Sequence, residues 1–154
     1  MAIDQYQSLD EIPPVSDDEW LLRLHFSPEH VCDGMLVPSA ISISDLGQRG
    51  LSIDREYLVN PEIIQKRAND QSAKLPDNRV VPYLSRFQCD SVRTIEYEGK
   101  VAFEVKASPF PTNFAHADIL SAQPLGKGGL KKLRCLLLEQ LQTLIPLDQY
   151  LKGR

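Results

Sequence analysis

Two short segments carry the side chains whose types and spacing could do chemistry. In the first, Leu51–Glu56, an extended chain would turn the Ser52 hydroxyl and the Asp54 carboxylate to one face, because side chains alternate along a strand. Arg55 follows, with a planar guanidinium suited to phosphate or carboxylate. Ser52, Asp54 and Arg55 are therefore candidates for positioning an anionic ligand. A turn with a structural Asp–Arg pair is the interpretation we favour.

The second segment is Asn113–Asp118, where His116 and Asp118 would share one face of an extended chain. A carboxylate beside an imidazole can orient or polarise it, as general bases require. A half-buried structural histidine is the interpretation we favour, and catalysis or ligand contact by His116 and Asp118 is the alternative. One His–Asp pair does not make a metal site, so neither a metal nor a cofactor is expected; His25 and His30 could join only if the fold brought them close.

A glycine-rich stretch before the last apolar helix is a candidate anion site. Its backbone N–H groups and the helix dipole favour negative charge, and lysines there oppose the dipole unless an anion is present. The stretch matches neither the Walker A pattern nor G-x-G-x-x-G. A flexible loop with solvated lysines is the alternative. The candidate residues are Lys127, Gly128, Gly129, Lys131 and Lys132.

Charge is distributed unevenly along a chain whose net charge is −4. Residues 1–19 hold acidic residues and no Lys or Arg, whereas residues 120–154 are mostly basic among their charged positions. Solvated surface explains such a pattern, since charged residues are mostly exposed. The sharper interpretation is that the basic end meets a phosphate-bearing small molecule or an acidic protein partner.

Composition argues against several other classes of protein. The pI is about 5.4, aromatic side chains are scarce near the basic end, and no nucleic-acid-reading motif occurs, so nucleic acid is not an expected partner. No apolar run reaches membrane-spanning length, and the first residues lack a secretory signal. The three cysteines are widely spaced and form no CxxC pair, which is typical of reduced thiols. We expect a cytoplasmic protein without membrane contact.

The 154 residues suit one domain. Residues 1–15 have few apolar groups and contain Pro13 and Pro14, which predicts a flexible acidic arm before a domain over residues 16–154. Ser16–Glu19 matches a helix-capping box, but the alternation over Trp20–Phe26 favours a strand.

Further elements follow from turn and capping signals. Asn60-Pro61 predicts a helix start, with the helix ending near Asn69-Asp70, and Pro82 predicts an edge strand over residues 80–84. Residues 91–107 alternate around a Glu98–Lys100 turn and predict a hairpin. Residues 114–120 are a further strand candidate. A leucine stripe predicts a helix from Leu130 to about Leu144.

These elements predict an α+β domain: a mostly antiparallel sheet, a long C-terminal helix packed on one face, and one or two short helices. Without a specific catalytic motif, the favoured function is a small accessory or interaction protein. The alternative is an enzyme, or a former enzyme, acting on a phosphate-bearing small molecule with Arg55 and His116 at its site. A nucleic-acid-associated role for the basic C-terminal helix is the second alternative. Convergence of the candidate residues in one concave pocket would favour the enzyme.

Overall fold

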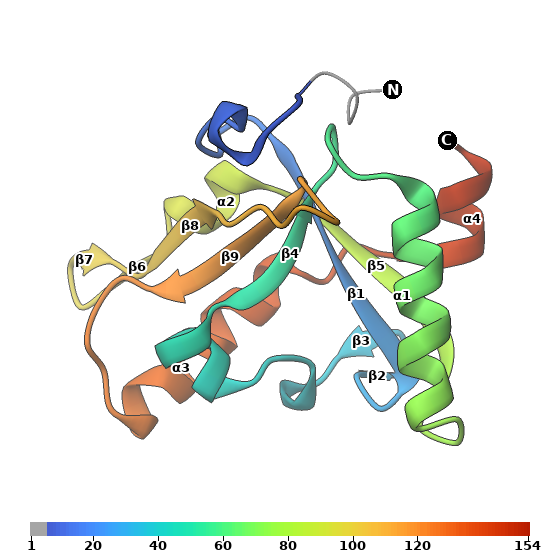
Figure 1. The fold of residues 1–154 in the computed structure, drawn as a ribbon. Helices are drawn as coiled ribbons and strands as arrows, with labels where there is room; N and C mark the ends of the chain where they lie inside the picture. Colours follow the sequence, from blue (N-terminus) through green and yellow to red (C-terminus); the bar gives the residue numbers. More distant parts are fainter. Residues whose placement is uncertain (1–5) are drawn as a thin grey trace.

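A computed structural model describes residues 6–154 of the chain, which are built on an antiparallel six-stranded sheet of order β10-β5-β1-β4-β9-β8 (Figure 1). The strands are β1 (Trp20–Pro28), β4 (Leu51–Arg55), β5 (Arg79–Gln88), β8 (Phe103–Ala107), β9 (His116–Ser121) and β10 (Leu144–Pro146). Every neighbouring pair is antiparallel. The predicted antiparallel sheet is therefore confirmed.

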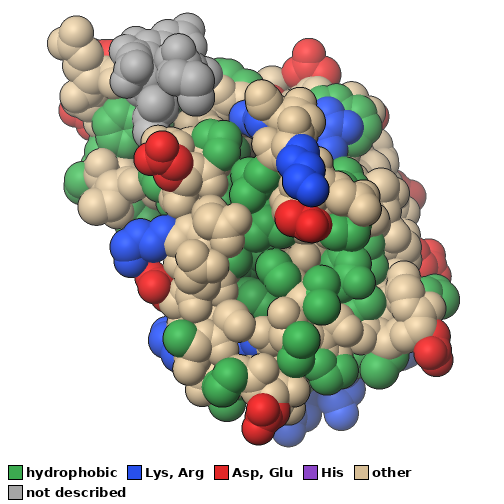
Figure 2. Space-filling model, turned by 90° about the vertical axis from the view of Figure 1, so that its right-hand side faces the viewer, with side chains coloured by type: hydrophobic (Ala, Val, Ile, Leu, Met, Phe, Trp, Pro, Cys, Tyr) green, Lys and Arg blue, Asp and Glu red, His purple; other side chains and the backbone are tan. Residues whose placement is uncertain are grey.

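Helices cover both faces of the sheet. Two of them, α2 (Cys89–Arg93) and α3 (Lys127–Gln140), bury side chains in one core, while α1 (Pro61–Lys74) and α4 (Leu147–Lys152) bury theirs in the other. Figure 2 shows apolar side chains gathered on the side of the molecule where α1 and α4 lie, with charged groups among them. The α+β prediction, with a C-terminal helix on one face, is confirmed. None of the described helices has the length and apolar character needed to cross a bilayer.

Shorter elements connect the layers. Two small hairpins pair β2 (Val31–Cys32) with β3 (Met35–Leu36), and β6 (Glu96–Tyr97) with β7 (Lys100–Val101). Single turns of 3-10 helix occupy Leu9–Glu11 and Pro38–Ala40, and a π-helical turn occupies Asp45–Arg49.

Helix α1 begins where the capping signal predicts and ends later than expected. The Asn60 side chain accepts a hydrogen bond from the Glu62 N–H at 2.9 Å, and Pro61 takes the first helical position. The helix continues past Asp70 to Lys74 because its apolar face is still buried at Ala68 and a Lys66–Asp70 pair links adjacent turns.

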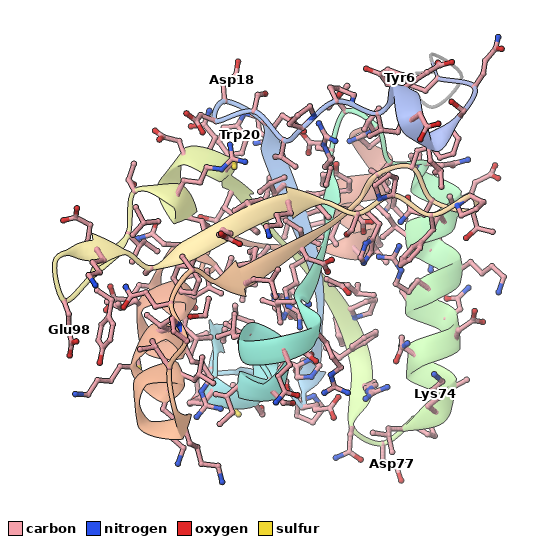
Figure 3. All side chains as sticks on the ribbon, turned by 60° about the vertical axis from the view of Figure 1, so that its left-hand side comes forward. Tyr6, Asp18, Trp20, Lys74, Asp77 and Glu98 are labelled. Carbon is pink, nitrogen blue, oxygen red and sulfur yellow. The ribbon has the colours of Figure 1, made fainter. Side chains whose placement is uncertain are left out.

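Other strand and helix boundaries also differ from the sequence prediction. Residues Cys89–Arg93 form α2 instead of a hairpin strand, since Cys89 and Val92, three positions apart, are both buried in the α3-side core. The predicted turn persists at the tip of the β6–β7 hairpin, where Glu98 lies (Figure 3). Helix α3 stops at Gln140, and Leu144 starts β10.

Strand β5 is not an edge strand, although it contains Pro82. It lies between β10 and β1. Because β10 pairs with β5 only from Ser85 to Tyr83, Pro82 lies just beyond the end of β10, where the missing N–H of proline disrupts no ladder on that side.

The end of the predicted N-terminal arm packs onto the domain; residues 1–5 lie outside the described residues. Val15 is 4% exposed and belongs to the α3-side core. The carbonyls of Pro13 and Pro14 accept hydrogen bonds from Arg55 at 2.7 and 3.1 Å. Residues 7–11 are exposed, so a flexible arm before Pro13 stays a prediction.

The most deeply buried titratable side chain on β1 is His25. It is fully buried, and neither ring nitrogen has a hydrogen-bond partner among the described residues. Its ring meets that of His30 edge to face, with centroids 6.1 Å apart. Burial, together with the nearby Arg23 charge and His30, holds the pKa of His25 well below its usual value.

Removal of residues 1–15 should destabilise the domain, because Arg55 would lose two carbonyl partners and the core would lose Val15. We expect a chain starting at Ser16 to lose about 3 kcal/mol of unfolding free energy relative to a chain starting at Tyr6, measured by urea denaturation. Equal midpoints for the two chains would show that these contacts contribute nothing.

His25 should make the protein less stable in mild acid. Unfolded His25 takes up a proton near pH 6.5 that the folded state resists, so its contribution is complete above that pH and decreases below it. Between pH 7 and pH 5 the wild type should lose about 2 kcal/mol more unfolding free energy than His25→Leu. The same pH dependence in both proteins would contradict this assignment.

Candidate functional site

Three adjoining cavities meet at Ser52, on the face of the sheet that carries α1. Their volumes are about 610, 480 and 390 Å³. The largest runs along α1 as far as Lys74, whose position at the end of that helix is labelled in Figure 3. His116 and Phe110 line the first two cavities, and Arg67 lines the first and third. Ser52 therefore borders all three cavities, which we call the trough.

The strand register explains why Ser52 meets His116. Antiparallel pairing of β4 with β9 sets Ser52 opposite Asp118 and Asp54 opposite His116, so all four side chains occupy one face. Ser52 Oγ lies 3.1 Å from His116 Nε2 across the two strands. Two of the candidate residues, Ser52 and His116, are thus brought together by the fold.

Ser108 orients the His116 ring. Its carbonyl oxygen lies 3.0 Å from His116 Nδ1, and its hydroxyl lies 2.8 Å from the same atom. A carbonyl can only accept, so the contact with the Ser108 carbonyl is a hydrogen bond in the tautomer that carries its proton on Nδ1, and in that tautomer the Nε2 lone pair faces Ser52. This arrangement of hydroxyl, imidazole and orienting group is the one that activates a serine nucleophile.

Asp118 does not orient His116 as the sequence predicted. Its Oδ1 lies 3.9 Å from Nε2, on the Ser52 side of the ring, whereas Nδ1 faces Ser108. Asp118 packs instead against Gly50, where an added Cβ would lie 2.7 Å from the carboxyl carbon and where φ is +91°. Sequence reasoning missed Ser108 because it stands eight positions away in an irregular proline-containing loop.

Phe110 extends the site beyond the histidine. Its ring centroid lies 4.4 Å from that of His116, and the side chain is 50% exposed. An exposed aromatic ring beside the imidazole gives the trough an apolar wall next to the Ser52–His116 pair.

Asp54 binds protein groups and not a ligand. Both its oxygens accept from Arg67 of α1, at 2.6 and 3.3 Å, and Oδ1 also accepts from Asn113 at 2.9 Å. With 3% exposure, Asp54 links β4 to α1 and to the loop before β9. The structural Asp–Arg pair considered from the sequence exists, with Arg67 in place of Arg55.

The structure places Arg55 away from the Ser52–His116 pair, which corrects the prediction of a shared site. Alternation along β4 turns its side chain away from the Ser52 face, and its guanidinium is fully buried. Glu19 accepts from Nε and Nη2 at 2.8 and 2.7 Å, and the Pro13 and Pro14 carbonyls take further donors. Arg55 is an internal anchor for the N-terminal segment.

Arg23 supports Ser52 from the neighbouring strand. Strands β1 and β4 pair only through Leu21–Arg55 and Leu22–Asp54, and Arg23 spans the gap beyond them. It donates to the Ser52 carbonyl at 2.7 Å and to the Ala40 carbonyl at 3.1 Å. Burial lowers its pKa to about 10, and Asp45 partly offsets that effect. Sequence reasoning missed Arg23 because it occupied an ordinary position in an alternating strand.

The glycine-rich segment lies on the other side of the sheet. It forms the first turn of α3, with Gly126 as a cap that provides no side-chain bond. Because α3 packs in the core opposite α1, this turn is separated from the trough. Anion binding there stays a prediction. The residues concerned are Lys127, Gly128, Gly129, Lys131 and Lys132.

The remaining histidines do not complete a metal site. His30 lines the 390 Å³ cavity, and its Nδ1 accepts from the Phe26 N–H at 3.0 Å. Within residues 6–154, no three His, Cys, Asp or Glu side chains are grouped so that they could hold a metal ion.

Comparison of the chain with protein-family models, with curated proteins and with solved structures gives no match.

Arg55→Ala should lower the unfolding free energy of the protein far more than Arg49→Ala does. The first change leaves the Glu19 carboxylate and two carbonyls without their buried partner, which costs about 3–5 kcal/mol. The second removes an exposed pair with Asp45, in which the Arg49 side chain is 70% exposed, and should change stability by less than about 1 kcal/mol. Thermal and urea unfolding of both variants measure the difference, and similar midpoints would refute the anchoring role.

Proposed function

We propose that the protein is a hydrolase that cleaves an ester in a phosphate-bearing small molecule, with Ser52 as nucleophile and His116 as base. One observation carries this proposal: Ser52 Oγ lies 3.1 Å from His116 Nε2 while Ser108 holds the opposite ring nitrogen. A serine hydroxyl is a weak nucleophile until an oriented base takes its proton.

The reaction would proceed in two balanced steps. His116 Nε2 takes the Ser52 proton as Oγ forms a bond to the carbonyl carbon of the ester, and the protonated ring then gives that proton to the departing alcohol oxygen. A water molecule next gives a proton to Nε2 and attacks the acyl-serine. Return of that proton to Ser52 Oγ releases the acid and restores both residues.

Exposure of the reacting groups supports this assignment. Ser52 is exposed in the trough, so a substrate can approach its hydroxyl. His116 is partly buried, held by Ser108 on one side and by the Phe110 ring on another. An exposed nucleophile with a fixed base is the arrangement that catalysis requires.

The observations behind the interaction-protein hypothesis are weaker once the fold is known. That hypothesis rested partly on an acidic arm open to a partner. Glu19, at the end of the acidic segment, is paired with Arg55, and the arm is held against the domain at Pro13–Val15. The enzyme is therefore the function that the geometry supports best.

A fluorophosphonate should label Ser52, forming an Oγ–P bond and releasing fluoride. We expect mass spectrometry to place the adduct on the peptide containing Ser52, and Ser52→Ala to abolish it. His116→Ala should slow labelling and p-nitrophenyl acetate hydrolysis about 100-fold or more, because the hydroxyl loses its base.

The control is Ser44→Ala, which removes another exposed serine hydroxyl while leaving the Ser52–His116 contact intact. It should be labelled at the wild-type rate. Labelling that persists in Ser52→Ala, or that is unaffected by His116→Ala, would contradict the proposed function.

A further inference from the structure

The 390 Å³ cavity beside Ser52 brings three guanidinium groups together from three different elements. They are Arg23 of β1, Arg67 of α1 and Arg79 of β5. The cavity lies where β1 and β4 separate, and Ser52 forms part of its wall. Three arginines around one hollow are the usual means of holding a phosphate, because each can direct several N–H donors to its oxygens.

Each arginine is fixed by protein contacts and still has donors to spare. Arg67 places both terminal nitrogens on Asp54, and Arg79 uses Nε on Glu29 and Nη1 on Gln71. Among the described residues, Arg67 Nε and Arg79 Nη2 have no hydrogen-bond partner and remain accessible, whereas Arg23 Nε has no partner and is itself buried, so a ligand would meet the Arg23 charge rather than this nitrogen. The cavity is therefore held in shape before a ligand arrives, which lowers the entropic cost of binding.

One of the three arginines has a charge that no carboxylate neutralises. Arg67 pairs with Asp54 at 2.6 Å and Arg79 pairs with Glu29 at 2.7 Å, while Asp45, the other carboxylate of the lining, pairs with Arg49 at 2.9 Å. Arg23 has no carboxylate within 4.0 Å in the described part of the chain, and its Nε is buried without a partner. A buried guanidinium without a counterion is unfavourable, and a bound anion would supply that counterion.

We infer that this cavity binds the phosphate group of the substrate, with Arg23, Arg67 and Arg79 as its ligands. The rest of the substrate would cross Ser52 towards His116 and Phe110, since Ser52 borders this cavity and the cavity that those two residues line. The inference rests on the proposed function for the reaction, whereas phosphate binding itself is measurable without any turnover.

Isothermal titration calorimetry with inorganic phosphate tests the cavity directly. Two adjacent α1 residues provide a matched pair, because Arg67→Gln and Lys66→Gln each remove one positive charge, but only Arg67 lines the arginine cavity. We expect Arg67→Gln to weaken phosphate binding about tenfold or more and Lys66→Gln to change it less than about threefold. Absence of phosphate binding to the wild type, or equal losses in the two variants, would overturn the inference.

A second variant tests the cavity even when Arg67→Gln fails to fold. Gln71 accepts from Arg79 Nη1 at 2.9 Å, so Gln71→Glu keeps that contact while placing a carboxylate at the cavity wall. Its melting temperature should match or exceed that of the wild type, and its phosphate affinity should fall about tenfold or more. A stable Gln71→Glu protein with unchanged affinity would refute the assignment.

Ser52→Ala separates this inference from the proposed function. It should bind phosphate as the wild type does, because the Ser52 group that Arg23 contacts is the backbone carbonyl. Phosphate should also slow fluorophosphonate labelling of the wild type, with half-inhibition near its dissociation constant. Normal labelling with no phosphate binding would refute the phosphate cavity alone, whereas phosphate binding without labelling would refute the hydrolase alone.

Discussion

The trough depends on how Arg23 holds two strands that have begun to separate. Strands β1 and β4 share only two register pairs, and an open gap in a sheet would leave backbone carbonyls without donors. Arg23 fills this gap by donating to the Ser52 and Ala40 carbonyls. The strand that carries Ser52, the proposed nucleophile, is thereby fixed beside a cavity on its β1 side, which is why Ser52 is exposed at the middle of a sheet.

Because side chains alternate along β4, those on its two faces have different roles. Leu51, Ile53 and Arg55 are buried away from the trough, where the leucine and isoleucine pack with α3 and the arginine anchors the N-terminal segment. Ser52 and Asp54 face α1. Only one of these two is open to a ligand, because Asp54 is covered by Arg67 and Asn113. A single pentapeptide thus supplies core, anchor, inter-element link and proposed nucleophile.

Local sequence patterns predicted much of the fold and of the site, but they could not predict the long-range contacts. The Asn60 cap, the β1 alternation and the shared face of His116 and Asp118 follow from rules that span a few residues. The partners of the charged groups do not follow from such rules. Arg55 donates to carbonyls more than 40 positions away, and Asp54 pairs with Arg67 and not with the adjacent Arg55. Ser108 and Arg23 gained their roles from strand register and strand separation, which no local spacing encodes.

The placement of Arg23 also bears on why its charge is retained. An apolar residue of similar size could fill the same gap at a lower cost of desolvation, since a buried cation without a carboxylate partner is destabilising. Such a residue would leave the Ser52 carbonyl without its donor and would remove the field that a guanidinium exerts on that strand. A positive charge behind Ser52 favours the negative charge that develops as its Oγ attacks an ester, and it favours an anion in the adjoining cavity. Retention of a buried arginine at this position, despite its cost in stability, is thus consistent with a site that binds a negatively charged ligand.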